Sequence, residues 1–209
     1  MALVVFLRGV NVGGHRRFRP SILAQQLGVF DVVNVGAAGT FVVRKPGSLA
    51  TFRKRLREKL PFETAVITCD GSDLLALEAR NPFGRKAPQS GVVRFVSVMP
   101  RATRVRVAPV RLPAVGKWLV RILGSDGRFV LGEYRRDMKT IGYLSQLDRM
   151  SGVQGTMRNW NTITTILRIL KAEADRPTSA APTRKDRSPL RPRSAPARKA
   201  PGRARGDRG

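Results

Sequence analysis

The residues best suited to chemistry lie in a glycine-rich segment, residues 8–19, which follows a short apolar run at residues 2–7. Gly9, Gly13 and Gly14 can adopt backbone conformations that other residues avoid, so several N–H groups can point at one anion. A helix that begins soon after the segment would add its positive N-terminal end. We therefore predict an anion-binding loop at this position. The cationic side chains around it are Arg8, His15, Arg16, Arg17 and Arg19.

The loop has the spacing of a P-loop without its chemistry. Gly9 and Gly14 are correctly spaced, but His15 and Arg16 stand where a lysine and a Ser or Thr would bind triphosphate and magnesium. The sequence therefore excludes a P-loop NTPase. The alternative for the loop is a tight crossover in which the glycines only save space and the arginines face solvent. His15, the only histidine, is either a general base, a phosphate ligand or a solvated side chain.

A second polar block, residues 158–162, precedes an apolar stripe with helical spacing. Its Asn and Thr side chains can cap a helix, and Trp160 can anchor the core. In the alternative interpretation, polar residues of this block contact a ligand opposite the glycine loop. The candidate ligand-binding residues of the two blocks are Arg8, Gly9, Asn11, Gly13, Gly14, His15, Arg158, Asn159 and Asn161.

The side-chain patterns of familiar hydrolases and metalloenzymes are absent from the sequence. It contains no Gly-x-Ser-x-Gly, no carboxylate pair at a helical spacing that suggests a catalytic dyad or a metal site, and only one histidine. We expect neither a metal nor another cofactor. Catalysis stays open as an alternative, in which a small-molecule site of unknown reaction lies between two halves of the chain.

The charge of the chain favours a partner that carries phosphate. Lys and Arg number 40 against 14 Asp and Glu, for a net charge of +26, and 31 of the 40 are arginines, which bind phosphate through a planar fork. Residues 1–175 alone hold 29 basic and 12 acidic residues. Basic residues gather at 53–59 and alternate with apolar ones at 104–111. We predict nucleic acid or a phosphorylated small molecule as the partner; the alternatives are solvated charged faces and compositional drift.

The elements that must position the loop follow a simple order in residues 1–70. Strand, helix, strand, strand, helix and strand succeed one another, which is the ferredoxin-like plan. Apolar runs, turn glycines and the apolar stripe of Leu49, Phe52, Leu56 and Leu60 indicate these elements. They are expected at residues 2–7, 21–27, 30–35, 40–44, 48–60 and 64–68.

Residues 71–175 roughly repeat this pattern. A helix capped by Asp70 or Ser72, a strand and an edge strand interrupted by Pro109 come first. A hairpin around residues 124–127 follows, then a helix that ends at Gly152 and a last helix capped by Thr156. The elements are expected at residues 73–79, 92–98, 104–113, 117–123, 128–134 and 141–150, with the last helix carrying the stripe Trp160, Ile163, Leu167 and Leu170.

The predicted fold class is α+β, with two ferredoxin-like (split βαβ) halves at residues 1–70 and 71–175, antiparallel sheets, and a basic tail. The tail, residues 176–209, has six prolines, no aromatic residue and one leucine, so it is predicted to be disordered. The lone Cys69 is typical of a reducing cytoplasm. No apolar run approaches membrane-spanning length, so we expect a cytoplasmic protein without a membrane partner.

Residues 6–14 and 156–162, together with Asn-Pro-Phe at 81–83, resemble the bacterial domain of unknown function 1697. The resemblance spans about residues 1–173. It implies a cytoplasmic α+β protein of two ferredoxin-like halves with no established activity. One block departs from the family pattern, because Ala38-Gly39-Thr40 stands where members usually have Ser-Gly-Asn. If relatives bind a ligand there, this chain is expected to bind it more weakly or to bind something else.

Overall fold

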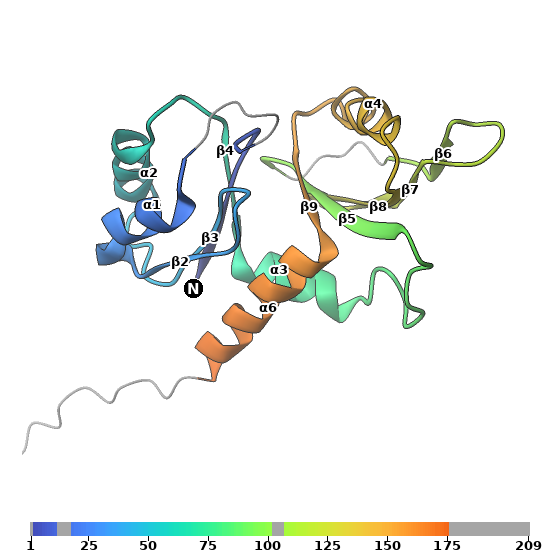
Figure 1. Cartoon of the computed structure of the whole chain (residues 1–209). Helices are drawn as coiled ribbons and strands as arrows, with labels where there is room; N and C mark the ends of the chain where they lie inside the picture. The colour runs from blue at the N-terminus through green and yellow to red at the C-terminus, as the bar shows by residue number, and fades with distance from the viewer. Residues whose placement is uncertain (1, 12–17, 102–106, 176–209) are drawn as a thin grey trace, which may run out of the picture. The chain divides into compact units, whose positions relative to one another are not determined.

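A computed structural model describes residues 2–11, 18–101 and 107–175 (Figure 1). Gly13, Gly14 and His15 of the predicted anion-binding loop lie outside the described residues, as does the predicted disordered tail from residue 176. Residues 104–106, the first three of the alternating basic segment, also lie outside the described residues. None of the described helices combines the length and hydropathy needed to cross a membrane.

The first half contains the six elements predicted for it, with one short addition. They are β1 (Leu3–Leu7), α1 (Pro20–Gln26), the 3-10 helix η1 (Gly28–Phe30), β2 (Val32–Asn34), β3 (Thr40–Val43), α2 (Leu49–Lys59) and β4 (Val66–Asp70). The strands form a sheet in the order β2-β3-β1-β4, and every neighbouring pair is antiparallel. This is the strand order of a ferredoxin-like fold, as predicted.

The second half builds a five-stranded sheet. Its elements are α3 (Gly71–Ala79), β5 (Val92–Val98), β6 (Val110–Leu112), β7 (Val120–Asp126), β8 (Phe129–Arg135), α4 (Thr140–Leu144), α5 (Leu147–Ser151), β9 (Thr156–Asn159) and α6 (Trp160–Ala174). The order β6-β7-β8-β5-β9 contains the arrangement of the first sheet, with β6 added at the edge. No helix occurs between β5 and β7 within the residues that the structure describes there. Both halves are thus ferredoxin-like, and the second lacks a described counterpart of α1.

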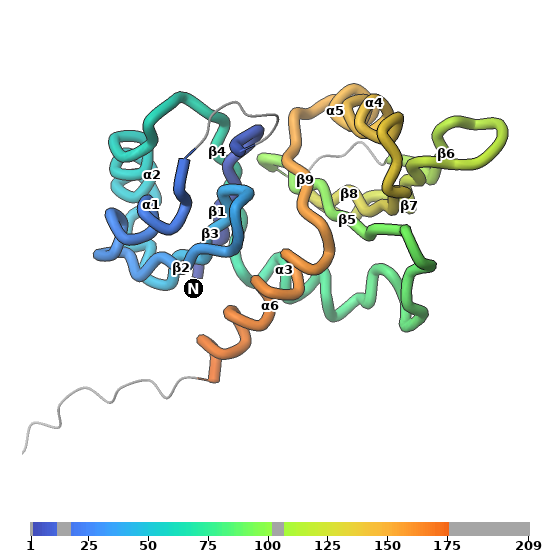
Figure 2. The backbone as a smooth tube through the Cα atoms, viewed as in Figure 1, coloured from blue at the N-terminus to red at the C-terminus, as the bar shows by residue number. Residues whose placement is uncertain are grey.

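Two predictions for the second half were wrong in detail. Thr156 does not cap the last helix, because Thr156–Asn159 pairs with β5 as strand β9. The cap is Asn159, whose side chain accepts a hydrogen bond from the Thr162 N–H at 2.8 Å. The helix expected at 141–150 is two short helices, α4 and α5, which lie beside each other in Figure 2.

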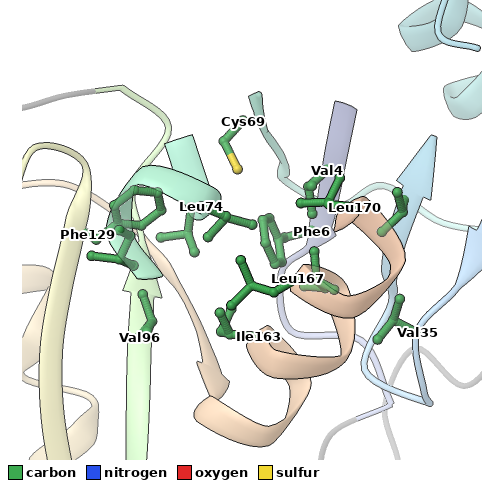
Figure 3. Close-up of a cluster of buried hydrophobic side chains, with 14 of the residues drawn as sticks. Val4, Phe6, Val35, Cys69, Leu74, Val96, Phe129, Ile163, Leu167 and Leu170 are labelled. Carbon is green, nitrogen blue, oxygen red and sulfur yellow. The ribbon is translucent and has the colours of Figure 1, made fainter. Parts of the chain in front are cut away.

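Each sheet is covered on both of its faces, and helices α3 and α6 pack against both sheets. Alternate residues of β1 point to opposite faces: Val4 and Phe6 pack with α3, α6 and the second sheet, whereas Leu3, Val5 and Leu7 pack with α1 and α2. We call the face of each sheet that packs on α3 and α6 its inner face. Figure 3 shows Ile163, Leu167 and Leu170 of α6 near Phe6 and Val4 of β1. The predicted stripe of α6 is therefore confirmed as core.

The opposite face of the second sheet packs on α5 and on residues of α4. Phe95, Val120, Ile122 and Val130 of the sheet form one cluster there with Leu147 of α5. A core that includes side chains from both sheets links the two halves through α3 and α6. Division of the chain into separate domains near residue 70 stays a prediction.

Candidate functional site

The end of β1 positions the first candidate residues. The backbone N–H of Arg8 still pairs with Ala65 O at 3.0 Å, and the chain then leaves the sheet through Gly9 at φ 62° and Asn11 at φ 54°. Both lie in the left-handed region, which glycine enters freely and asparagine tolerates better than most residues. This local geometry turns the chain away from the sheet directly after Leu7.

Asn11 closes the base of the glycine-rich loop. Its Nδ2 donates to Phe18 O at 3.1 Å and to Ala37 O at 2.7 Å, while its Oδ1 accepts from the Phe18 N–H at 3.0 Å. The amide group therefore ties the two ends of residues 11–18 together and fastens them to the turn between β2 and β3. Both of its donors and its acceptor are used within the protein. A ligand at Asn11 would have to replace these bonds or share the oxygen.

Arg8 reaches from the first half to the second. Its Nε donates to Gly155 O at 3.0 Å, and its guanidinium forms an ion pair with Asp148 of α5. The other oxygen of Asp148 accepts from the Gly155 N–H at 3.0 Å, so Arg8 and Asp148 together hold the N–H and the carbonyl of one residue, Gly155. The side chain of Arg8 is 37% exposed, which leaves part of its charge open to solvent.

Arg158 is the most completely bonded of the candidate residues. Its Nε donates to Thr40 Oγ1 at 2.6 Å, one terminal nitrogen donates to Thr156 Oγ1 and Met157 O, and the other donates to Leu7 O and Ala38 O at 2.8 and 2.7 Å. A guanidinium has five N–H donors, and all five are used. No carboxylate is paired with Arg158 among the described residues.

Burial of Arg158 has an electrostatic cost that its hydrogen bonds offset. The residue is 7% exposed, and desolvation lowers the pKa of its guanidinium to about 10. Phe6 lies under it, with 5.6 Å from the guanidinium carbon to the ring centroid. Thr40 of β3 and Ala38 in the turn before it supply two of the acceptors. Arg158 joins β9 to the end of β1 and has no donor left for a ligand.

The asparagines of the second block face away from this network. Asn159 is exposed, and its Oδ1 accepts both the N–H and the hydroxyl of Thr162, at 2.8 Å each. Asn161 is exposed in the first turn of α6, where its carbonyl accepts from the Thr165 hydroxyl at 3.0 Å. The structure thus brings Arg8, Asn11 and Arg158 to the end of β1 and uses Asn159 as a helix cap. Ligand binding by Asn159 and Asn161 stays a prediction.

A cavity of about 680 Å³ opens beside Arg8. Arg57 of α2, Gln154 and the segment at residues 60–65 line it together with Arg8. Such a volume is within the range of small-molecule sites. Sequence reasoning singled out Arg8 and the basic segment containing Arg57, but not Gln154 or residues 60–65. These come together only through tertiary folding, and no local spacing indicates them.

The exposed face of α2 carries the predicted basic cluster. Phe52 and Leu56 of the predicted stripe are buried on the first sheet, whereas Leu49 in the first turn is exposed. Arg53 donates to Thr68 Oγ1 at 2.9 Å, and Arg55 pairs with Glu58 at 3.1 Å. Within the described ranges, the side chains of the remaining three have no hydrogen bond or ion pair. These three are Lys54, Arg57 and Lys59, which we call the α2 cations.

Metal-binding geometry is absent from the part of the chain that the structure describes. No group of three or more His, Cys, Asp or Glu side chains comes close enough together there to hold an ion. Cys69 is buried in the inner core, and desolvation raises the pKa of its thiol to about 12. A thiol that stays protonated is a poor nucleophile and a poor metal ligand.

Comparison with known proteins identifies the family and gives no activity. No curated protein matches the chain. Among solved structures, a conserved bacterial protein from Streptococcus pneumoniae is similar, with a TM-score of 0.48 and 17% identity over 81% of this chain and 98% of that one. The family described as protein of unknown function (DUF1697) matches residues 1–112, more than half of the chain. The chain therefore belongs to the DUF1697 family.

Proposed function

We propose that this protein binds nucleic acid and performs no chemistry on it, with the α2 cations as the main contact. The observation that carries the proposal is that Lys54, Arg57 and Lys59 lie on one exposed helix segment without hydrogen bonds or ion pairs among the described residues. Cations that are not already neutralised can release condensed counterions when they meet phosphates. Contacts of this kind give affinity without sequence preference.

The cavity beside Arg8 strengthens the proposal that phosphate binds near the α2 cations. Arg57 is both one of the α2 cations and a lining residue, so the cavity opens next to at least this one of the three cations. Arg8 adds a second, partly exposed guanidinium. A phosphate at this mouth would meet the Arg57 guanidinium, whose planar fork suits bidentate bonding, and the N–H groups of Arg8 that Gly155 and Asp148 do not use. The proposal therefore extends the phosphate track from the α2 face to the edge of the cavity.

The test compares two variants of equal charge change in the full chain. One is Lys54→Gln/Arg57→Gln/Lys59→Gln, and the other carries Gln at three basic tail positions, Arg184, Arg187 and Arg191. Binding of a fluorescein-labelled oligonucleotide is measured by anisotropy at low salt. We expect the α2 variant to lose about tenfold or more in affinity, since each lost phosphate contact weakens binding. Equal losses in the two variants, or no binding by the wild type, would overturn the proposal.

A second candidate function is binding of a phosphorylated small molecule inside the cavity. The cavity volume of about 680 Å³ favours it, because a nucleic-acid backbone needs no enclosed space. Thermal-shift measurements against nucleotides and phosphosugars test this candidate directly. A ligand of the cavity should stabilise the wild type and lose its effect in Arg57→Gln, whereas Lys54→Gln should retain it. If no compound raises the melting temperature, this candidate is discarded.

A further inference from the structure

The inner face of the second sheet changes character along its strands. Val96, Val98, Phe129 and Leu131 are apolar and pack with α3 and α6. Further along the same face the strands carry charge, because Arg94 of β5 pairs across with Glu133 of β8 in the sheet register. On the next strand, Arg121 of β7 lies opposite Glu133. A face that begins as core therefore ends as a charged surface.

The one buried carboxylate on this surface is fully engaged by its neighbours. Glu133 is 4% exposed and pairs with Arg94, whose Nε lies 3.3 Å away, and with Arg121, whose Nε donates at 2.7 Å. Arg94 is held further by donation to Phe83 O at 3.2 Å and by stacking over the Phe83 ring. Glu133 thus neutralises about one positive charge of the two that it touches.

A tryptophan joins this pair to Arg135, whose guanidinium has no hydrogen-bond acceptor among the residues that the structure describes. Arg121 lies over the ring of Trp118 at 4.8 Å, and Arg135 lies over it at 4.3 Å, measured from the guanidinium carbon to the ring centroid. The Arg135 side chain has no ion pair within the described residues, and its buried Nε lacks a hydrogen-bond acceptor there. Buried donors in proteins are normally satisfied, so either a water molecule or a ligand is expected to supply the acceptor of this N–H.

More positive charge surrounds the stack. Arg111 of β6 lies opposite Arg121 in the sheet register, and Arg111, Lys117 and Arg136 are all exposed. The nearby Asp137 is the opposing charge, and one of its oxygens accepts from the Lys139 backbone N–H at 2.9 Å. The surface therefore combines planar groups that can stack with cations that can meet phosphates.

We propose that Trp118, Arg121 and Arg135 form a second nucleic-acid contact that binds single-stranded rather than duplex chains. Bases of a single strand can stack on an aromatic ring or on a guanidinium plane, and a phosphate can supply the acceptor that Arg135 lacks. An acidic peptide would match the charge but would leave the stacked planar groups unused. The inference rests on the proposed nucleic-acid function and names its class of ligand.

Tryptophan fluorescence tests the stacking directly. The chain has two tryptophans, so Trp160→Phe leaves Trp118 as the single reporter. Titration of this full-length variant with oligo(dT) should quench the emission, because a stacked base contacts the ring. A duplex of equal length and inorganic polyphosphate should bind with little quenching. Equal quenching by polyphosphate, or no quenching by a bound single strand, would overturn the inference.

Affinity separates this inference from the proposed function. Trp118→Leu should weaken oligo(dT) binding by about tenfold, from the loss of one stacked base, while Trp118→Phe retains most of it. Duplex affinity should change little in either variant, and melting curves verify that both fold. If Trp118→Leu folds and keeps wild-type affinity while the α2 variant loses binding, the second contact is refuted and the proposed function stands. If Trp118→Leu does not fold, the fluorescence titration decides.

Discussion

Two arginines on the inner face of the second sheet have opposite surroundings. Arg158 of β9 uses all five N–H donors within the protein, whereas the buried Nε of Arg135 on β8 has no acceptor among the described residues. Arg158 belongs to a polar block that stands out in the sequence, residues 158–162, whereas Arg135 belongs to no motif. An arginine that stands out in the sequence can therefore be a structural clamp, while one outside every motif keeps an unused buried donor. The number of N–H donors that already have an acceptor distinguishes these two arginines better than their membership in a motif does.

The largest effect is expected from removal of the clamp. Arg158→Met should lower the free energy of unfolding by about 3 kcal/mol or more, because buried backbone and hydroxyl oxygens lose a charged donor. Arg158→Lys should also destabilise the fold, since an ammonium group cannot reach the same acceptors. Urea unfolding monitored by circular dichroism measures both. Arg168→Met, at an exposed position of α6, is the control and should be nearly neutral.

A matched glycine pair tests how tightly the hairpin beside Arg158 is packed. Gly39 and Gly36 both have positive φ, 64° and 73°, but only at Gly39 would a Cβ meet other atoms, with Val10 Cγ2 at 2.6 Å and Leu7 Cβ at 2.9 Å. Both Ala substitutions cost about 1 kcal/mol of backbone strain, and Gly39→Ala should cost about 1–3 kcal/mol more from overpacking. Thermal unfolding compares them. Equal losses would show that the hairpin is loosely held.

Glu133 lies on the same charged surface as Arg135, so its substitution tests the properties of that surface. Glu133→Gln should destabilise the fold by about 1–2 kcal/mol, because two partly buried arginines lose their shared carboxylate. The same change makes the surface more positive, so oligo(dT) affinity should rise at low salt. Asp126→Asn, which breaks the exposed pair with Arg80, should change stability by about 0.5 kcal/mol or less. A fall in oligo(dT) affinity for Glu133→Gln would count against the second contact.

Cys69 provides the smallest expected effect, in the pH dependence of stability. Desolvation raises the pKa of its thiol to about 12 from an ordinary value of 9.0. Above pH 9 the unfolded chain releases this proton and the folded chain retains it, so stability present below pH 9 is lost as the pH rises toward 12. Between pH 8 and 10 the wild type should lose about 1 kcal/mol more than Cys69→Ala. Urea midpoints at both pH values provide the measurement, and parallel losses would contradict it.

Alternation and turn residues were enough to predict the first sheet. The apolar run at 2–7, the glycines at 36 and 39 and the stripe through Phe52 and Leu56 each indicated one element correctly. Thr156 was misleading because Ser, Thr and Asn all cap helices, and the strand that ends at Asn159 is only four residues long. A strand this short is defined by its pairing with a neighbouring strand rather than by its own sequence, and β9 pairs with β5.

The chemistry of the site was less accessible from the sequence. The structure brings Arg8 close to the second block, because Arg8 bonds to Gly155 O and Arg158 bonds to the carbonyl of Leu7, the residue before Arg8. The hydrogen bonds of Arg158 depend on backbone carbonyl groups that the fold brings to it, and no pattern of side chains in the sequence indicates these groups. The stack of Arg121 and Arg135 on Trp118 depends in the same way on the pairing of β7 with β8.

The salt dependence of oligonucleotide affinity tests the central claim most directly. The logarithm of the association constant should fall linearly with the logarithm of salt concentration, with a slope of about 0.7 for each phosphate of a single strand that is neutralised. We predict that neutralising the α2 cations lowers this slope by about two, while the three-position tail variant lowers it less. A slope that is unchanged in the α2 variant would show that these three side chains do not contact phosphate, and would contradict the account.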